Sequence, residues 1–197
     1  GKYVYYCLNQ KESGTGSELH YHPNELLIFG LKGKINAVVG KERKIVYPGT
    51  FILIPPNVRH SMKATEDGPC AYLYIKDSTW TVVGVSADEE LPDQAMSVEE
   101  VNRKFEKGEI EDRKNKGASN SSKKQNKSII IDGVPNCYYE IMKKIDQEYS
   151  VGNSIREIHG ERMNFKFYEL TKKYEEKQKE SNHEYFFYVL DGKLNFS

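Results

Sequence analysis

The sequence predicts an all-β fold in which a small barrel is followed by a related second unit. The first 76 residues contain several short apolar runs, separated at close intervals by Gly, Pro and Asn. Short runs with this spacing are typical of a sandwich or barrel of antiparallel strands. A segment of this first unit also reappears near the C-terminus, so the chain contains an internal repeat.

The strands of the first unit are predicted from β-forming runs and from the turns between them. Gly33, Gly40 and Pro48-Gly49 mark turns, and Pro55-Pro56 ends a continuous apolar run. We expect strands at 2–8, 18–31, 34–39, 44–47, 50–54, 61–64, 71–75 and 80–85.

A helix and a polar linker are expected between the two units. Ser97-Val-Glu-Glu100 is a capping box and predicts a short helix to about Lys107, which Gly108 ends. Residues 109–128 are rich in Lys, Asn and Ser, as in a disordered charged linker. A basic nucleic-acid-binding arm is the alternative, but no aromatic residue lies among the lysines. We therefore divide the chain into a first unit (1–86), a helix with linker (87–127) and a second unit (128–197).

The second unit is expected to mix strands with one helix. Residues 128–132 have β character, and residues 165–170 alternate as a strand does. Five apolar residues between them have helical spacing and predict a packed helix face: Tyr138, Ile141, Met142, Ile145 and Tyr149.

Composition limits the classes of function. The formal net charge is zero, which gives no general electrostatic attraction to nucleic acid or to an anionic membrane. No apolar run approaches the length that spans a bilayer. The three cysteines (Cys7, Cys70 and Cys137) have no C-x-x-C spacing, so we expect buried thiols and a cytoplasmic, reducing environment. The expected partners are a small-molecule substrate and a second copy of the chain in a homodimer, with no nucleic acid and no membrane.

Three histidines suggest a metal site. His20 and His22 are two positions apart on a predicted strand, so their side chains point to the same face. His60 follows the apolar run 50–54 and can approach the same point from a neighbouring strand. Neutral imidazole is a common ligand of Zn, Fe, Ni and Cu. The sequence therefore predicts one divalent transition metal inside the barrel.

The surrounding residues resemble the two signature motifs of the cupin superfamily. In the first motif, Gly14 lies six residues before His20, the first histidine of the pair with His22, and Glu25 and Gly33 follow. In the second, Gly49, Pro55 and His60 have the family spacing, with Asn57 at a position where the family has glycine. Asn tolerates the left-handed backbone that such a turn requires. The resemblance covers residues 1–76 and implies a jelly-roll barrel with a metal held by His20, His22, Glu25 and His60.

Glu25 departs from the family pattern by one position. The family's glutamate ligand would fall at Leu26, and a slip of one residue on a strand turns a side chain to the opposite face. Glu25 is a ligand if a bulge at Pro23-Asn24 turns it inward, and it is a residue of the other face if no bulge occurs.

The internal repeat indicates a two-cupin protein. Residues 183–195 match residues 24–36 at an offset of 159, and both segments end in Gly-Lys-aliphatic-Asn. Lys179 and Ser181 stand where the first copy has its histidine pair, so the second copy is degenerate. His183 is either a residual ligand or a solvent-side histidine. The second unit looks incomplete, and we expect the chain to be a fragment of a longer bicupin.

Three functions are compatible with this resemblance. The first is a metal-dependent, dioxygenase-like cupin enzyme, with iron as the leading metal and Zn, Ni, Mn or Cu as alternatives, acting on a small oxygen-rich organic substrate. The second is a metal-dependent lyase or isomerase, and the third is a binding or storage bicupin without turnover. Tyr47, Tyr74 and Arg59 are the candidate catalytic residues, with one of the tyrosines as a proton donor or substrate anchor and the arginine as a partner for a substrate carboxylate. Packing in the barrel wall or simple solvation is the alternative for each.

Overall fold

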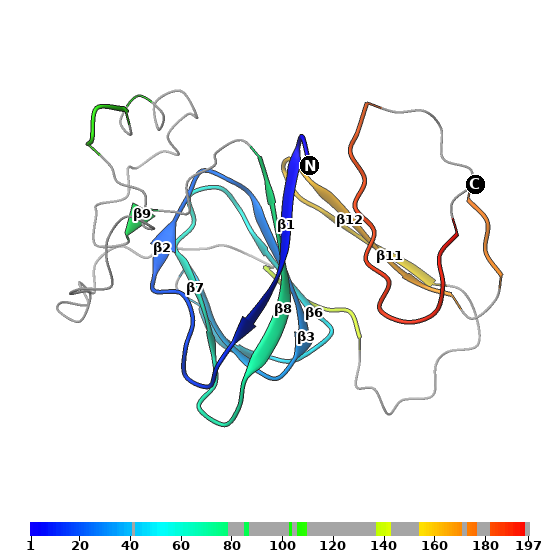
Figure 1. Ribbon diagram of the computed structural model, residues 1–197, viewed down its shortest axis with the longest axis horizontal. Helices are drawn as coiled ribbons and strands as arrows, with labels where there is room; N and C mark the ends of the chain where they lie inside the picture. The colour runs from blue at the N-terminus through cyan, green and yellow to red at the C-terminus, as the bar shows by residue number, and fades with distance from the viewer. Residues whose placement is uncertain are drawn as a thin grey trace.

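Two antiparallel sheets face each other in the computed structural model (Figure 1), which describes residues 1–40, 42–78, 85–86, 103, 106–109, 137–142, 154–170, 173–176 and 182–195. One sheet has the strand order β1-β8-β3-β6-β10 and the other has the order β5-β4-β7-β2-β9. The first sheet consists of β1 (Val4–Lys11), β8 (Cys70–Asp77), β3 (Leu26–Lys32), β6 (Thr50–Ile54) and β10 (Tyr138–Glu140). The second consists of β5 (Glu42–Val46), β4 (Ile35–Val39), β7 (His60–Ala64), β2 (His20–Tyr21) and β9 (Val85–Ser86). The all-β jelly-roll prediction is confirmed.

Alternate residues of the facing strands fill the space between the two sheets. Leu26 and Ile28 of β3 are fully buried there, together with Ile52 and Ile54 of β6. The second sheet contributes Ile35, Ala37, Val39, Met62 and Ala64 to the same cluster. The period of two along each strand places this apolar set on one face, as expected for a barrel interior.

The outer face of the first sheet is also buried, because a β-hairpin covers it. Leu27 and Phe29 point away from the barrel interior and belong to a second apolar cluster. The hairpin is formed by β11 (Ser154–His159) and β12 (Asn164–Glu169), which pair with each other antiparallel. Its residues in the cluster are Ile158, Met163, Phe165 and Phe167. Burial on both faces explains why the apolar runs of β3 and β6 are continuous and do not alternate with polar residues.

The structure corrects three expectations about secondary structure. The single strand predicted at 18–31 is two strands, β2 and β3, separated by a turn that contains Pro23, which has no N–H to donate. Residues 138–140, predicted as helix, form β10 on the open edge of β6, and the N–H of Leu53 donates to the carbonyl oxygen of Cys137 beside it (2.8 Å). Strand β11 was not predicted, because only Ile155 and Ile158 are apolar in it and they do not alternate.

The strand at 164–169 and the positions of the tyrosine-rich first strand agree with the predictions. The strand at 128–132, most of the helix at 97–107 and nearly all of the linker at 109–128 lie outside the described residues. Near that helix's end, the N–H of Lys107 donates to the carbonyl oxygen of Arg103 (3.1 Å), and Gly108 has a φ of 69°. This geometry is that of a helix C-terminus capped by glycine.

The three cysteines are free thiols. Cys70 and Cys137 are buried and Cys7 is half-buried, and burial raises the pKa of each thiol above its ordinary value. They are therefore poor nucleophiles at neutral pH. Among the described residues, no helix is both apolar enough and long enough to traverse a lipid bilayer.

Candidate metal centre

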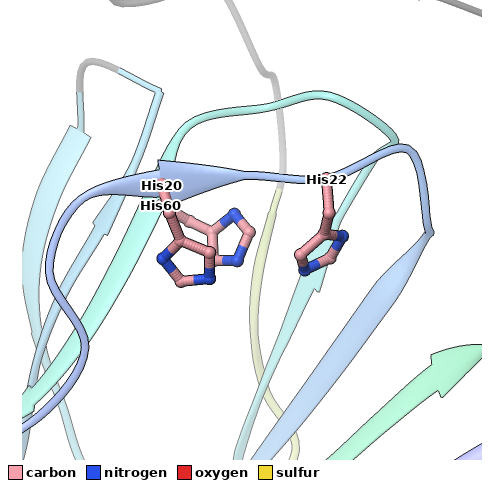
Figure 2. A group of neighbouring side chains, drawn as sticks. All are labelled: His20, His22 and His60. Atoms are coloured by element: carbon pink, nitrogen blue, oxygen red, sulfur yellow. The ribbon is translucent and has the colours of Figure 1, made fainter. Parts of the chain in front are cut away.

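Adjacent strands bring the three predicted histidines together. His20 in β2 lies directly opposite His60 at the start of β7, and His60 also faces Val39 of β4. His22 follows β2 and lies on the same side of the chain as His20, two positions away. Figure 2 shows the three rings on one side of the strand that carries His20 and His22. All three residues are buried.

The rings converge closely enough to share one ion. A nitrogen atom from each lies within 4.8 Å of the other two. The ring centroids are 4.3 Å apart for His20 and His60, 4.9 Å for His22 and His60, and 5.8 Å for His20 and His22. Two nitrogens bound to one metal at about 2.1 Å each are separated by at most about 4.2 Å. Small ring rotations therefore suffice to close the site around an ion.

Backbone carbonyls orient all three rings. His20 Nδ1 lies 2.8 Å from the carbonyl oxygen of Glu18, and His60 Nδ1 lies 2.8 Å from that of Val58. His22 Nδ1 lies 3.2 Å from the carbonyl oxygen of Asn24. A carbonyl oxygen only accepts hydrogen bonds, so these contacts assign the ring proton to Nδ1 and leave the Nε2 lone pair for a ligand.

His22 shows that these residues fit a metal. Its Nε2 is buried and has no hydrogen-bond partner, which is costly for a polar atom unless something binds it. Burial, followed by the neighbouring His60 and His20, holds the pKa of His22 well below its ordinary value. The ring is therefore neutral at physiological pH, which is the form that binds metal.

The turn of the second motif helps to hold the backbone of the metal site in place. Asn57 has a φ of 60°, the left-handed conformation expected from its place in that motif. Its backbone N–H donates to the carbonyl oxygen of His22 (2.8 Å). The turn before β7 therefore fixes the backbone of His22 as well as delivering His60.

Glu25 lies outside the group of histidines. Its side chain leaves the strand on the face opposite to Leu26, which points into the barrel interior. The carboxylate accepts hydrogen bonds from the backbone N–H groups of Glu161, Arg162 and Met163 (2.6, 2.9 and 2.8 Å). The one-residue slip thus has the consequence that strand geometry predicts, and no bulge reverses it.

Residues 10–76 match the family model described as a cupin domain. The match spans both histidine-bearing motifs, and the jelly-roll architecture agrees with it. Residues 10–76 form a cupin domain. No curated protein matches this chain in sequence.

Several solved structures are similar to the cupin domain at low identity. TT1209 from Thermus thermophilus is 20% identical over 39% of this chain and 74% of its own, with a TM-score of 0.38. The DMSP lyase DddQ from Ruegeria pomeroyi is 18% identical over 47% of each chain (TM-score 0.41). A salicylate 1,2-dioxygenase from Pseudaminobacter salicylatoxidans is 18% identical over 39% of this chain and 22% of its own (TM-score 0.37). Similarity at this level says nothing about the activity of this chain.

Tyr47 does not reach the histidines, which corrects its predicted role. It follows Val46, which pairs with Ile35 at one end of β4, whereas His60 pairs with Val39 at the other end. Four positions along a strand correspond to about 13 Å. Its side chain is also 59% exposed.

Tyr74 and Arg59, unlike Tyr47, are at least partly shielded from solvent, as a role in the barrel interior requires. Tyr74 lies in β8 opposite Ile28, and its ring packs against the cluster of the barrel interior. Burial raises the pKa of Tyr74 above its ordinary value, so its phenol remains protonated at neutral pH. Arg59 precedes His60 and is only 3% exposed, so it is not a solvated loop residue. Its contact with a substrate carboxylate stays a prediction.

Lys76 is a residue of the site that sequence reasoning missed. It lies opposite Leu26 and two positions from Tyr74, so alternation directs its side chain into the barrel interior. The side chain is only 6% exposed, and its charge contributes to the lowered pKa of His22. The signal in the sequence is a lysine at an inward-facing position of an apolar strand.

Proposed function

We propose that the cupin domain is a metal-dependent enzyme, dioxygenase-like, that binds one transition-metal ion through His20, His22 and His60 and acts on a small, oxygen-rich, anionic organic substrate. The observation that carries the proposal is the common orientation of the three imidazoles. Each ring is held by a backbone carbonyl at Nδ1, and one nitrogen atom of each ring lies within 4.8 Å of the other two in a buried space. Structural histidines that merely fill a core have no need of this convergence.

The charge balance favours an anionic substrate. Three neutral imidazoles leave the full charge of a divalent ion uncompensated, because Glu25 is turned away to the backbone of residues 161–163. Lys76 adds a further positive charge in the same interior. A metal ion whose charge is not balanced by its ligands, in a space of low dielectric constant, favours a ligand that carries a carboxylate or an ionised hydroxyl group.

The chain's own residues supply positioning and a proton. Lys76 orients the anionic end of the substrate, and the barrel walls exclude bulk water, which strengthens this attraction. The Tyr74 phenol, protonated at neutral pH, donates a hydrogen bond or a proton to an oxygen on which negative charge develops. A bound metal ion supplies Lewis-acid polarisation and, if it is iron or copper, redox chemistry with dioxygen.

Iron is the proposed metal, since a site in which only histidines converge, among the residues that the structure describes, resembles iron sites among cupin oxygenases. The test is anaerobic reconstitution with Fe(II), removal of excess metal and elemental analysis of the full chain. We expect about one iron per chain in the wild type and almost none in His22→Ala and His60→Ala. The matched control is His159→Ala, which removes an exposed histidine outside the group and is expected to retain the metal.

Oxygen uptake then separates the functions. Consumption of dioxygen by the iron form with a panel of small hydroxy-, oxo- and aromatic carboxylates supports the dioxygenase-like activity. Metal bound in both the wild type and His60→Ala would overturn the ligand assignment. Turnover of the same panel by the zinc or nickel form, without oxygen uptake, would replace the proposal by the lyase or isomerase.

The lyase or isomerase is the second candidate because the domain offers an internal proton donor. In that reaction Tyr74 acts as an acid, since the raised pKa opposes its use as a base. A binding cupin without turnover is the third candidate. It would be favoured by a wild type that binds small carboxylates without stoichiometric metal.

A further inference from the structure

We propose that residues 160–195 are a second copy of the segment 1–36, and that a pseudo-two-fold axis relates the two copies. One glutamate of each copy binds backbone amides of the other copy, and we call each of these two contacts a clasp. The repeat found by sequence covers residues 24–36 and 183–195. Contacts among the described residues extend the same offset back to Gly1 and Gly160.

The first clasp is made by Glu25. Its buried carboxylate accepts hydrogen bonds from three consecutive backbone N–H groups, those of residues 161, 162 and 163, at the tip of the β11–β12 hairpin. Three aligned amides form a small concave anion site, and a buried carboxylate is stabilised by such a set of donors.

The second clasp is made by Glu184, which is the equivalent of Glu25 at the offset of 159. Its carboxylate accepts hydrogen bonds from the N–H groups of Lys2, Tyr3 and Val4 (3.0, 2.8 and 2.9 Å). The bond from Tyr3 is the largest cause that lowers the pKa of Glu184 below its ordinary value. These three residues are the equivalents, at the same offset, of the three that Glu25 binds.

The residue that precedes each set of three amides is also the same in both copies. Gly160 and Gly1 are equivalent at the same offset, and both are glycine. A Cβ atom on Gly160 would overlap the carboxylate of Glu25, and one on Gly1 would overlap that of Glu184. Close approach of a carboxylate to the backbone therefore explains the glycine in each copy.

Apolar residues beside the clasps also correspond between the two copies. Tyr6 of the first copy stacks on Phe186 of the second, with ring centroids 4.0 Å apart. Their equivalents are Phe165 and Leu27, and both belong to the apolar cluster that β11–β12 forms on the outer face of the first sheet. Phe186 packs against this same cluster, so one continuous apolar contact joins the two copies.

Exchange of this kind is the mark of two-fold symmetry. If a segment of one copy contacts a second segment of its partner, and the reverse contact also exists, the interface is isologous. Two unrelated anchors would have no reason to share the offset at the glutamate, at three amides and at a glycine. The partner of the outer face of the first sheet is thus the second copy within the same chain.

Recognition through backbone amides explains why the copies can differ so much in sequence. The triplets read Glu-Arg-Met and Lys-Tyr-Val, yet both present the same N–H groups. Side-chain contacts are not repeated: Arg162 Nη1 donates to the carbonyl oxygen of Pro23 (2.9 Å) and to Asp77 Oδ2 (3.2 Å), whereas its equivalent is Tyr3. Only the carboxylate and the glycine need to be the same in both copies.

The test uses the amide signals of the ¹⁵N-labelled full chain. We expect Glu25→Gln to speed hydrogen exchange of amides 161–163 by at least about tenfold, and to shift their proton signals upfield, as the charged acceptor is lost. Glu184→Gln should have its largest effects on amides 2–4. The control Glu140→Gln removes an exposed carboxylate that pairs with Lys44 and should leave both triplets unchanged. Unchanged amides 2–4 in Glu184→Gln would overturn the two-fold arrangement.

A second measurement keeps the carboxylates intact, in case Glu25→Gln does not fold. In a background without the native cysteines, the pair Tyr6→Cys/Phe186→Cys should form an intramolecular disulfide under mild oxidation, seen as a mass loss of about 2 Da. The control pair Tyr6→Cys/Ile45→Cys, with one member on an exposed position of β5, should not. No cross-link in Tyr6→Cys/Phe186→Cys would contradict the contact between the two copies.

Discussion

Lys76 places a positive charge beside a site that is proposed to hold a cation. The side chain lies in the interior at 6% exposure, and the pKa of neighbouring His22 is lowered partly by its charge. Lys76 Nζ also lies 5.8 Å from the centroid of the Tyr5 ring. In the proposed function, the charge of Lys76 attracts an anion bound at the metal, so we propose the lysine as a specificity residue for anionic substrates.

The effect of Lys76 can be measured with a simple anion. Azide bound to the cobalt(II)-substituted protein is followed by visible absorption. We expect Lys76→Met, which preserves length but removes the charge, to weaken azide binding by at least about fivefold, corresponding to about 1 kcal/mol of charge interaction. Lys63→Met is the control, because Lys63 is at the surface and pairs with Glu18 (2.9 Å). Equal azide affinity in Lys76→Met and the wild type would remove Lys76 from the site.

At the scale of elements, the inner face of β8 combines burial with ionisable phenols. Burial raises the pKa of Tyr72 and Tyr74 on this strand, and also that of Tyr138 on β10, above the ordinary value of 10.0. In each case the charged phenolate would be taken out of water without a compensating partner. The barrel therefore requires these side chains to be protonated.

This requirement predicts alkaline instability. The folded-state pKa exceeds the unfolded one, so the stabilisation is fully present below pH 10 and is lost as the pH rises above it. We expect the melting temperature to fall steeply above pH 10, and tyrosinate absorbance at 295 nm from these residues to appear together with the loss of the circular dichroism signal. Tyr72→Phe, which cannot ionise, should show a shallower fall. Titration of all tyrosines in the folded protein, before unfolding, would contradict the prediction.

Strands with a strong local signal were predictable, and strands that depend on distant partners were not. Continuous apolar runs and glycine turns located β3 to β8, since local sequence determines both. Strand β10 exists because the edge of β6 lies open beside it, which no helical or alternating pattern in residues 138–140 reveals. Strand β11 gains its burial from strands β3, β6 and β8, all more than 70 residues earlier in the chain, mainly through Ile158.

The same distinction holds for the residues of the site: those with a local sequence signal were predictable, and those that depend on distant partners were not. The three histidines were found because motif spacing and strand period fix their directions. Lys76 was missed because its importance comes from the strand that it faces, and Tyr47 was wrongly included because pairing register, which places it at the far end of β4, is not visible in a single sequence. The side-chain direction of Glu25 followed from the period of two, but its partners at residues 161–163 did not.

For the whole molecule, the metal site and the clasp between the two copies share one short segment. His22 and Glu25 are three positions apart, and the turn between them is held by Asp77, whose carboxylate accepts from the N–H of Glu25 (2.6 Å) and whose carbonyl oxygen accepts from Asn24 Nδ2 (2.7 Å). Arg162 of the second copy adds its bond to Asp77. Binding at the histidines therefore stabilises a segment on which both copies depend.

Metal binding should raise the stability of the entire chain. A ligand that binds only the folded state at about 100 times its dissociation constant adds about 2.7 kcal/mol. For a chain of this size, each kcal/mol shifts the melting temperature by about 2–4 °C, so cobalt(II) or zinc(II) should raise it by about 5–10 °C and EDTA should reverse the change. Differential scanning fluorimetry measures the shift.

The pattern among histidine variants makes this test specific. His60→Ala should lose the shift, because two histidines bind a divalent ion far more weakly than three. His159→Ala should keep it, since that ring is exposed and its Nδ1 contacts Asn164 Oδ1 (3.1 Å) outside the group. An equal shift in the wild type and His60→Ala would mean that the ion stabilises the chain from another place, and the three-histidine assignment would fail even if the purified protein contained metal.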